Sequence, residues 1–136
     1  MATISQVRGA LRDALNNIPG LVPYSTEVGQ IVAPAAVVVT PDVDFHQTFG
    51  SSALNQMQFR VLVLVAQSLT ETAAAQLDTY VDPASSVSVR AVIEADTTLG
   101  GVVETLIVDQ FRPLGVEEAA ALGYWGGEFL VTVYAR

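Results

Sequence analysis

The feature that most constrains the fold is one long strand pattern over residues 56–67. Apolar side chains alternate onto one side of it, at Met57, Phe59, Val61, Val63 and Val65. The other side is polar at Gln58 and Arg60 and then apolar at Leu62 and Leu64. A strand that becomes apolar on both sides runs from the margin of a sheet into its covered centre. The chain is therefore expected to build a sheet with other elements packed on it.

Helical periodicity is predicted in three places. Two capping-box spacings are present. Thr3 with Gln6 opens a helix over residues 4–16, and Ser68 with Glu71 opens a helix that ends at about residue 81. A shorter helix is expected over residues 86–95. The inward positions of the three helices are Ile4, Val7, Leu11, Ala14, Leu15, Ala74, Leu77, Tyr80, Val81, Val89, Val92 and Ile93.

Four more segments have the composition of strands, namely residues 21–26, 35–40, 102–111 and 128–135. Proline lacks an amide donor, so Pro34 and Pro41 are expected to bracket the second of them. Gly126 and Gly127 suggest a tight turn before the last strand, and the glycines of residues 97–101 suggest left-handed backbone. Residues 113–127 read as an irregular stretch, in which 116–122 could form one or two helical turns.

The order of these elements predicts an α+β fold in a single domain over residues 1–136. It consists of a mixed, mostly antiparallel sheet with helices packed on one face. Residues 42–55 form a long hairpin tip or an excursion loop, a kind of segment that is often functional.

Charge excludes several classes of partner. The net charge is −8, and the six basic residues are all arginine. Proteins that grip nucleic acid neutralise phosphates with clustered cations, and adhesion to anionic membranes needs the same cations. The chain has no cysteine for a disulfide or a thiolate metal site. It shows neither a membrane-spanning run nor a secretory signal, which predicts a protein made and kept in the cytoplasm or in something assembled there.

The balance of apolar and charged residues favours self-assembly. Hydrophobic residues make up 51% of the chain and charged residues 15%, against a typical quarter charged. One small core cannot hide that much apolar surface, so part of it is expected to face partner subunits. The alternative is that many of these residues are alanine and valine, which a surface tolerates.

No catalytic or cofactor-binding constellation is evident, and we expect a protein that is not an enzyme and has no cofactor. His46, the single histidine, follows Asp42 and Asp44 at alternate positions, where three side chains on one strand face could hold a divalent cation. The alternative, a solvated loop, is favoured because there is no fourth ligand nearby. Ser and Thr have no candidate base beside them, and there is no phosphate-binding glycine loop followed by lysine.

One arrangement of motifs extends over nearly the whole chain. A capped helix leads into a valine strand, a loop and the long strand of residues 56–67. Next come a helix containing residues 74–78, the turn Asp96-Thr97-Thr98-Leu99-Gly100-Gly101, and a closing strand from Gly126-Gly127-Glu128-Phe129. In this the chain resembles the tail terminator proteins of long-tailed bacteriophages, and the neck and tail-completion proteins related to them.

The resemblance implies a virion protein at the tail–neck junction. It would form a ring, expected to be a homohexamer, that ends tail-tube polymerisation and offers a docking surface to the head. Its partners would be copies of itself, the tail tube protein and the head–tail connector, and DNA would pass the channel without specific binding. The loop over residues 42–55 would reach a neighbour or the tube, which places Phe45, His46, Phe49 and Met57 at an interface. Phe45→Ala or Phe49→Ala should then weaken assembly and spare the folded monomer.

Two alternatives stay open at this point. Another neck or head-completion protein, or a tail tube subunit, would share the pattern and differ in its number of copies. A small-ligand binding module would use a pocket between the sheet and the helix pair, near Tyr80 and Trp125.

Overall fold

A computed structural model describes residues 3–24, 34–44, 55–66, 71–82, 84–85, 87–113 and 125–135. The helices are α1 (Ile4–Leu15), α2 (Glu71–Val81) and α3 (Val89–Glu94). The strands are β1 (Val22–Tyr24), β2 (Ala35–Asp44), β3 (Asn55–Ala66), β4 (Thr105–Pro113) and β5 (Trp125–Ala135). Over these ranges the chain has the predicted α+β fold.

The five strands form one sheet in the order β1-β2-β3-β5-β4. The short β1 runs parallel to β2, and the other three pairings are antiparallel. The long strand predicted from its alternation is β3, and it lies at the centre with β2 and β5 on either side. Val61 sits opposite Val38 on one side and Phe129 on the other. The prediction of a mixed, mostly antiparallel sheet is confirmed.

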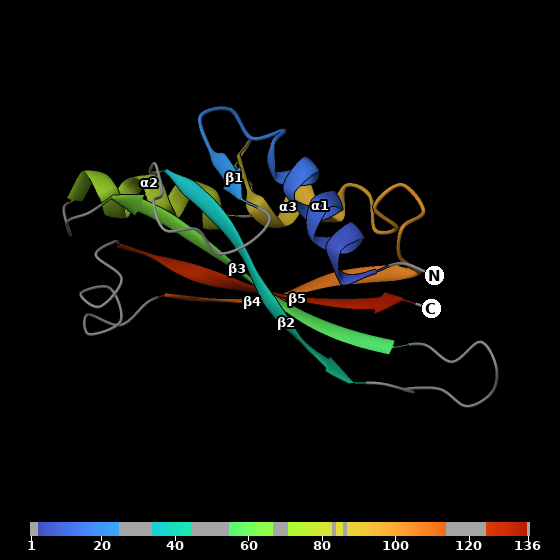
Figure 1. Cartoon of the computed structure of the whole chain (residues 1–136). Coiled ribbons are helices and arrows are strands. Elements are labelled where there is room, and N and C mark those ends of the chain that lie inside the picture. Colours follow the sequence, from blue (N-terminus) through green and yellow to red (C-terminus); the bar gives the residue numbers. More distant parts are fainter. Residues whose placement is uncertain are drawn as a thin grey trace.

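All three helices lie on the same side of the sheet (Figure 1). Because side chains alternate across a strand, one row from each strand points at the helices. From the central strands that row consists of Ala36, Val38, Met57, Phe59, Val61, Val63, Phe129, Val131 and Val133. The helices contribute Val7, Leu11, Leu15, Leu77, Tyr80, Val89 and Ile93 to the same core. The core therefore lies between the sheet and one helical layer.

The ends of two helices are fixed by side-chain caps. The Thr3 hydroxyl accepts a hydrogen bond from the Gln6 amide at 3.1 Å, and the Gln6 side chain accepts from the Thr3 amide at 2.8 Å. This reciprocal pair is the predicted capping box. Ser88 caps α3 by accepting from the Ala91 amide at 3.3 Å. Ser68, proposed to cap α2, lies outside the described residues.

Two strand boundaries predicted from Pro and Gly are wrong. Pro41 lies inside β2, where the register shifts between Val39 and Asp42. A bulge leaves a residue out of the hydrogen-bond ladder, so the missing amide of proline is tolerated there. Gly126 and Gly127 belong to β5, opposite Leu64 and Val63 of β3. They are strand residues and do not form a turn.

The hairpin that joins β2 to β3 begins later than the sequence predicts. Asp42 and Asp44 are strand residues, opposite Gln58 and Gln56, and Asn55 begins β3. The connection, residues 45–54, lies outside the described residues, as do residues 114–124, in which a helical turn was considered. Among the helices of the described ranges, none combines the length and apolarity needed to cross a bilayer.

Candidate functional site

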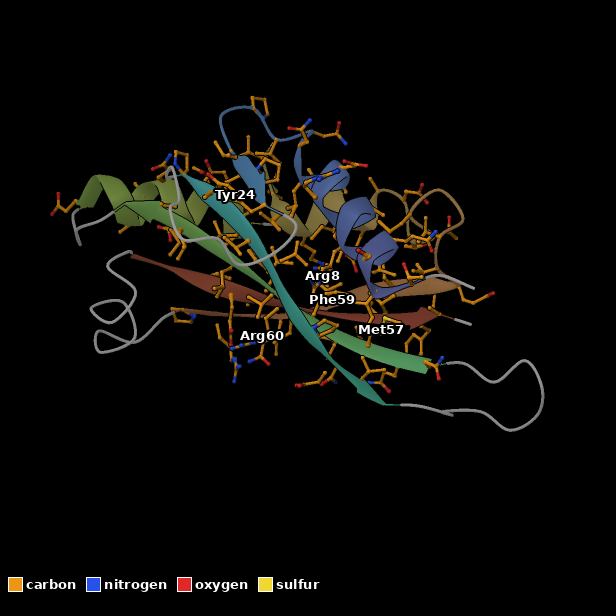
Figure 2. The ribbon with its side chains drawn as sticks, in the orientation of Figure 1. Arg8, Tyr24, Met57, Phe59 and Arg60 are labelled. Atoms are coloured by element: carbon orange, nitrogen blue, oxygen red, sulfur yellow. The ribbon has the colours of Figure 1, made fainter. Side chains whose placement is uncertain are left out.

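The face of the sheet turned away from the helices is one candidate surface. Figure 2 shows Arg60 on this side, opposite the helical layer. Its residues alternate with those of the core, so it receives Gln58 and Arg60 from β3 and Thr132 from β5. Ile107 and Arg112 of β4 join them across the register. We call these residues, together with Glu128 and Asp109, the open sheet face.

Three charged side chains cross the open sheet face from strand to strand. Glu128 of β5 accepts from Arg60 Nη1 of β3 at 3.3 Å, and its other carboxylate oxygen accepts from Arg112 Nη2 of β4. The Glu128 side chain is only 8% exposed, whereas Arg60 and Arg112 are about half exposed. A carboxylate so far removed from water needs charge partners. The two arginines therefore neutralise Glu128 and still present donors to solvent.

A second polar group stands beside this charged row. Asp109 follows Val108 at an irregularity in the β4–β5 register, and its carboxylate accepts from the buried Thr132 hydroxyl. On the edge of β4, the Val108 amide donates to Glu94 Oε2 at 3.2 Å, and Glu94 Oε1 accepts from Arg90 Nε at 2.8 Å. Glu94 thus ties α3 to the irregular part of the strand.

An exposed apolar side chain lies among these polar groups. Ile107 is 47% exposed and lies opposite Thr132. Single exposed apolar residues are common on monomers. Leu130, diagonal to Ile107 across the β4–β5 pairing, and Leu62, further along on β3, are also partly exposed and belong to the same face. Leu130 and Leu62 adjoin Arg60 and Glu128, and Ile107 lies beyond them opposite Thr132.

The sheet is not open along its full length. Ala35, Val37 and Leu64 face away from the helices, yet each is at most 2% exposed. This agrees with the prediction that the second half of the long strand is apolar and covered on both faces. The accessible part of the face is therefore the half that carries Arg60, Ile107 and Arg112.

Both margins of the sheet offer backbone to a further strand. Among the described residues, no strand pairs with the outer side of β4, and β1 covers only residues 35–37 of β2. Unpaired strand edges are sites for pairing with another chain unless they are blocked. Two features limit how much of the β4 edge can pair with another strand: Glu94 already accepts from the Val108 amide, and Pro113 has no amide donor. This favours a short, specific contact over continuous pairing of strands from many chains.

The structure describes one of the four predicted interface residues. Met57 is 5% exposed and packs in the core beneath the helices. Its burial within the chain argues against an interface role. Phe45, His46 and Phe49 lie outside the described residues. The sequence does not predict the row of Arg60, Glu128 and Arg112, although Arg60 and Glu128 are charged residues within strand patterns and Arg112 directly follows one, which is a usable signal.

The metal hypothesis gains no support from what is described. Asp42 is an exposed residue of β2, and His46 lies outside the described ranges. Within the described residues, no three side chains of the His, Cys, Asp and Glu types come together as a possible metal site.

A small cavity lies between the sheet and the helix pair, on which the ligand-binding alternative depends. It has a volume of about 290 Å³ between the ends of α2 and α3 and strands β4 and β5, and it is bordered by Val81, Phe111 and Phe129. Tyr80 is a core residue outside this lining, and burial raises the pKa of its hydroxyl, against the lowering effect of a hydrogen bond with Gln76. The side chain of Trp125 is not described. The volume is at the lower limit of roughly 300 Å³ for small-molecule pockets.

Comparison with known proteins does not assign the chain. No protein-family model matches the sequence, and no curated protein matches it.

Proposed function

We propose that the chain is a structural subunit that assembles with copies of itself into a closed ring of the phage tail-terminator type. The observation that carries the proposal is the one-sided sheet. Helices cover one face (Figure 1), while part of the other presents the partly exposed Leu62, Leu130 and Ile107 beside the Arg60–Glu128–Arg112 row, with Arg60 opposite the helices (Figure 2). An apolar patch with a polar rim is the usual composition of a protein contact surface.

The two sheet margins support a ring in preference to a two-fold dimer. The β4 edge and the uncovered part of β2 lie on opposite sides of the sheet and differ in sequence and strand direction. Two unlike surfaces on one subunit suit a heterologous contact, which closes into a ring when the rotation between neighbours is right. Six copies would form the ring, as the resemblance to tail terminators implies.

Charge is compatible with a channel through which DNA slides. The chain carries a net charge of −8, so the assembled wall would repel phosphates at long range. Glu128 neutralises part of the charge of Arg60 and Arg112. These two arginines would therefore not act as a strong phosphate clamp.

The test is whether the protein caps tail tubes. Purified protein is mixed with tail tubes assembled in the absence of a terminator, and tube ends are examined by electron microscopy. The proposal predicts one ring at one end of each tube and no further growth when tube subunits are added. Continued growth with bare ends would contradict it.

Copy number separates the related assignments. A terminator is present as one ring per particle, whereas a tail tube subunit is present in many. Quantitative mass spectrometry of purified particles distinguishes the two. A neck or head-completion protein would bind the head connector and leave tube growth unaffected.

A further inference from the structure

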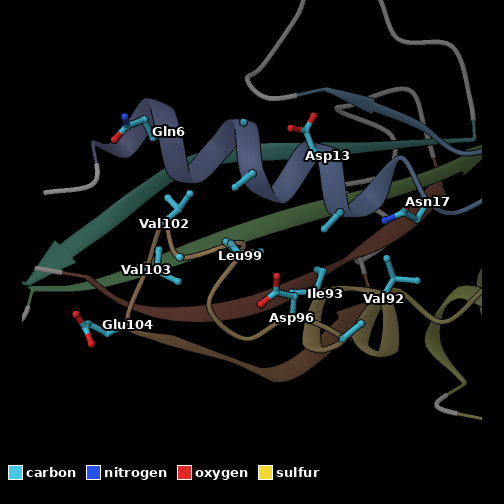
Figure 3. A pocket seen from close by; sticks show the side chains of 15 residues that line it. Gln6, Asp13, Asn17, Val92, Ile93, Asp96, Leu99, Val102, Val103 and Glu104 are labelled. Atoms are coloured by element: carbon cyan, nitrogen blue, oxygen red, sulfur yellow. The ribbon is translucent and has the colours of Figure 1, made fainter.

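A wide groove lies on the helical side of the molecule, away from the open sheet face (Figure 3). Its volume is about 1020 Å³. One wall is α1, and the other runs from the end of α3 through residues 99–104 to β4. The groove is open to solvent, so it resembles a furrow for a polypeptide more than a chamber for a small ligand.

The bottom of the groove is apolar. Ile93, Leu99 and Val103 form its buried part, and Val92 and Val102 are partly exposed above them. These side chains belong to the core of the chain, so the bottom is held in place by packing beneath it.

The wall opposite α1 is fixed by the Asp96 carboxylate. It accepts hydrogen bonds from the Thr98 hydroxyl at 2.9 Å, the Thr98 amide at 3.1 Å and the Gly100 amide at 2.8 Å. Leu99, Gly100 and Gly101 follow one another with φ of +50°, +70° and +93°. Leucine rarely adopts this conformation, which is retained only where the surroundings enforce it. The wall is therefore preformed.

The charged side chains among the described lining residues are acidic. They are Asp13, Asp96 and Glu104, which stand at the margins of the groove, and Asp13 pairs with the exposed Arg12 at 3.2 Å. Hydrogen bonds from the Thr98 side chain, the Gly100 amide and the Thr98 amide lower the pKa of Asp96, so this carboxylate stays charged at neutral pH. A ligand complementary to the groove would combine an apolar side with positive charges.

The wall formed by α1 has small residues where a neighbour would need to come close. Gly9, Ala10 and Ala14 face the groove. Glycine within a helix costs roughly 0.5–1 kcal/mol relative to alanine. Within this chain nothing requires it, because a Cβ added at Gly9 meets no atom within 4 Å. Close approach of another backbone would make use of that space.

We propose that this groove binds a basic amphipathic helix of a partner protein, with its apolar side on Val92 and Val102 and its cations beside Asp13, Asp96 and Glu104. The groove lining on this side runs along α1 from Gln6 to Ala14 and continues to Asn17 just past the helix end, which at a rise of about 1.5 Å per residue gives a docking length of roughly two to three turns. The site is separate from the open sheet face, so this inference does not rest on ring formation.

The experiment uses the whole chain, labelled with ¹⁵N, and three synthetic helical peptides. The first has a leucine stripe flanked by arginines, the second replaces arginine with glutamate, and the third keeps the first composition in an order without a stripe. Binding is measured by fluorescence anisotropy and located by amide chemical shifts. We expect saturable binding of the first peptide alone, with shifts confined to α1 and residues 92–104.

Two matched variants make the test specific. Gly9→Leu adds a side chain to the α1 wall of the groove, at a position where a Cβ meets no atom within 4 Å, and it should weaken binding by at least about tenfold, or ~1.4 kcal/mol. Ser5→Leu adds the same side chain at an exposed position of α1 outside the groove, and it should leave binding unchanged. The pair Asp13→Asn with Glu104→Gln should also weaken binding.

Several results would overturn the inference. These are the absence of binding, equal binding of the peptide without a stripe, and unchanged binding by Gly9→Leu. The second result would mean that overall negative charge alone attracts basic peptides. Failure of ring assembly would leave all these readouts unaffected, so the two proposals can fail separately.

Discussion

The ring of Phe111 in β4 lies directly over Gly127 in β5. A Cβ added at Gly127 would come within 2.6 Å of Phe111 Cε1 and 2.8 Å of the Arg112 carbonyl oxygen. The same ring packs against Phe129 at a centroid distance of 4.9 Å and an interplanar angle of 59°. Gly127 thus leaves the space that lets two aromatic rings meet at the end of the sheet. Position 127 is therefore restricted to glycine by its neighbour in the strand.

Gly127→Ala should destabilise the fold, because the added methyl group displaces Phe111. We expect a loss of about 1–3 kcal/mol in the free energy of unfolding, as for other overpacked cores. Urea denaturation followed by circular dichroism measures it. The same change in a Phe111→Ala background should cost less, with a remaining loss from the close Arg112 carbonyl oxygen.

The control for this prediction is Gly9→Ala, which adds the same methyl group in open space. It should stabilise the chain by up to about 1 kcal/mol through helix propensity. Equal stability of Gly127→Ala and the unchanged protein would show that the strand accommodates a side chain there.

Arg60 and Arg112 are expected to act together on Glu128. Either arginine alone still provides a counter-charge, so Arg60→Met and Arg112→Met should each have a small effect of about 1 kcal/mol or less. The double variant leaves an 8% exposed carboxylate without its two cations and should lose more than the sum. A double-mutant cycle in urea measures the difference. Additive losses would contradict the joint role.

Asp96 predicts a dependence of stability on pH. Its pKa in the folded chain is lowered from 3.8, first by the Thr98 hydroxyl and then by the Gly100 and Thr98 amides. A carboxyl group whose pKa is lowered in the folded chain stabilises the folded state at pH values above its pKa in the unfolded chain. This contribution is lost as the pH falls through the pKa of the folded chain. The difference in unfolding free energy between the chain and Asp96→Asn should therefore be constant near neutral pH and shrink below pH 3.8.

Thr98→Val provides the control for Asp96. It removes the hydroxyl donor and should raise the pKa of Asp96 toward 3.8, as measured by NMR titration of the side-chain carboxyl. An unchanged pKa would show that the backbone amides alone hold the carboxylate.

Much of the fold could be predicted from local patterns. The central strand, the capping box of α1 and the inward helix positions Leu11, Leu77 and Ile93 follow from periodicity and side-chain chemistry. The left-handed glycines at 100 and 101 also follow from composition. These features depend on residues close together in the sequence.

The remaining features depend on contacts between distant parts of the chain. Pro41 is accepted in β2 because the register with β3 shifts there, and Gly127 is required by a ring 16 residues before it. The Arg60–Glu128 pair joins residues 68 positions apart. No local pattern carries this information.

The oligomeric state of the purified protein tests the central proposal most directly. Sedimentation velocity and light scattering over a series of concentrations should show a closed assembly of six copies. Ile107→Glu should yield a monomer with an unchanged urea midpoint, because Ile107 is 47% exposed. Ser5→Glu, which adds the same charge on the helical side, should assemble normally. A monomer at every concentration, or an assembly indifferent to Ile107→Glu, would contradict the proposal.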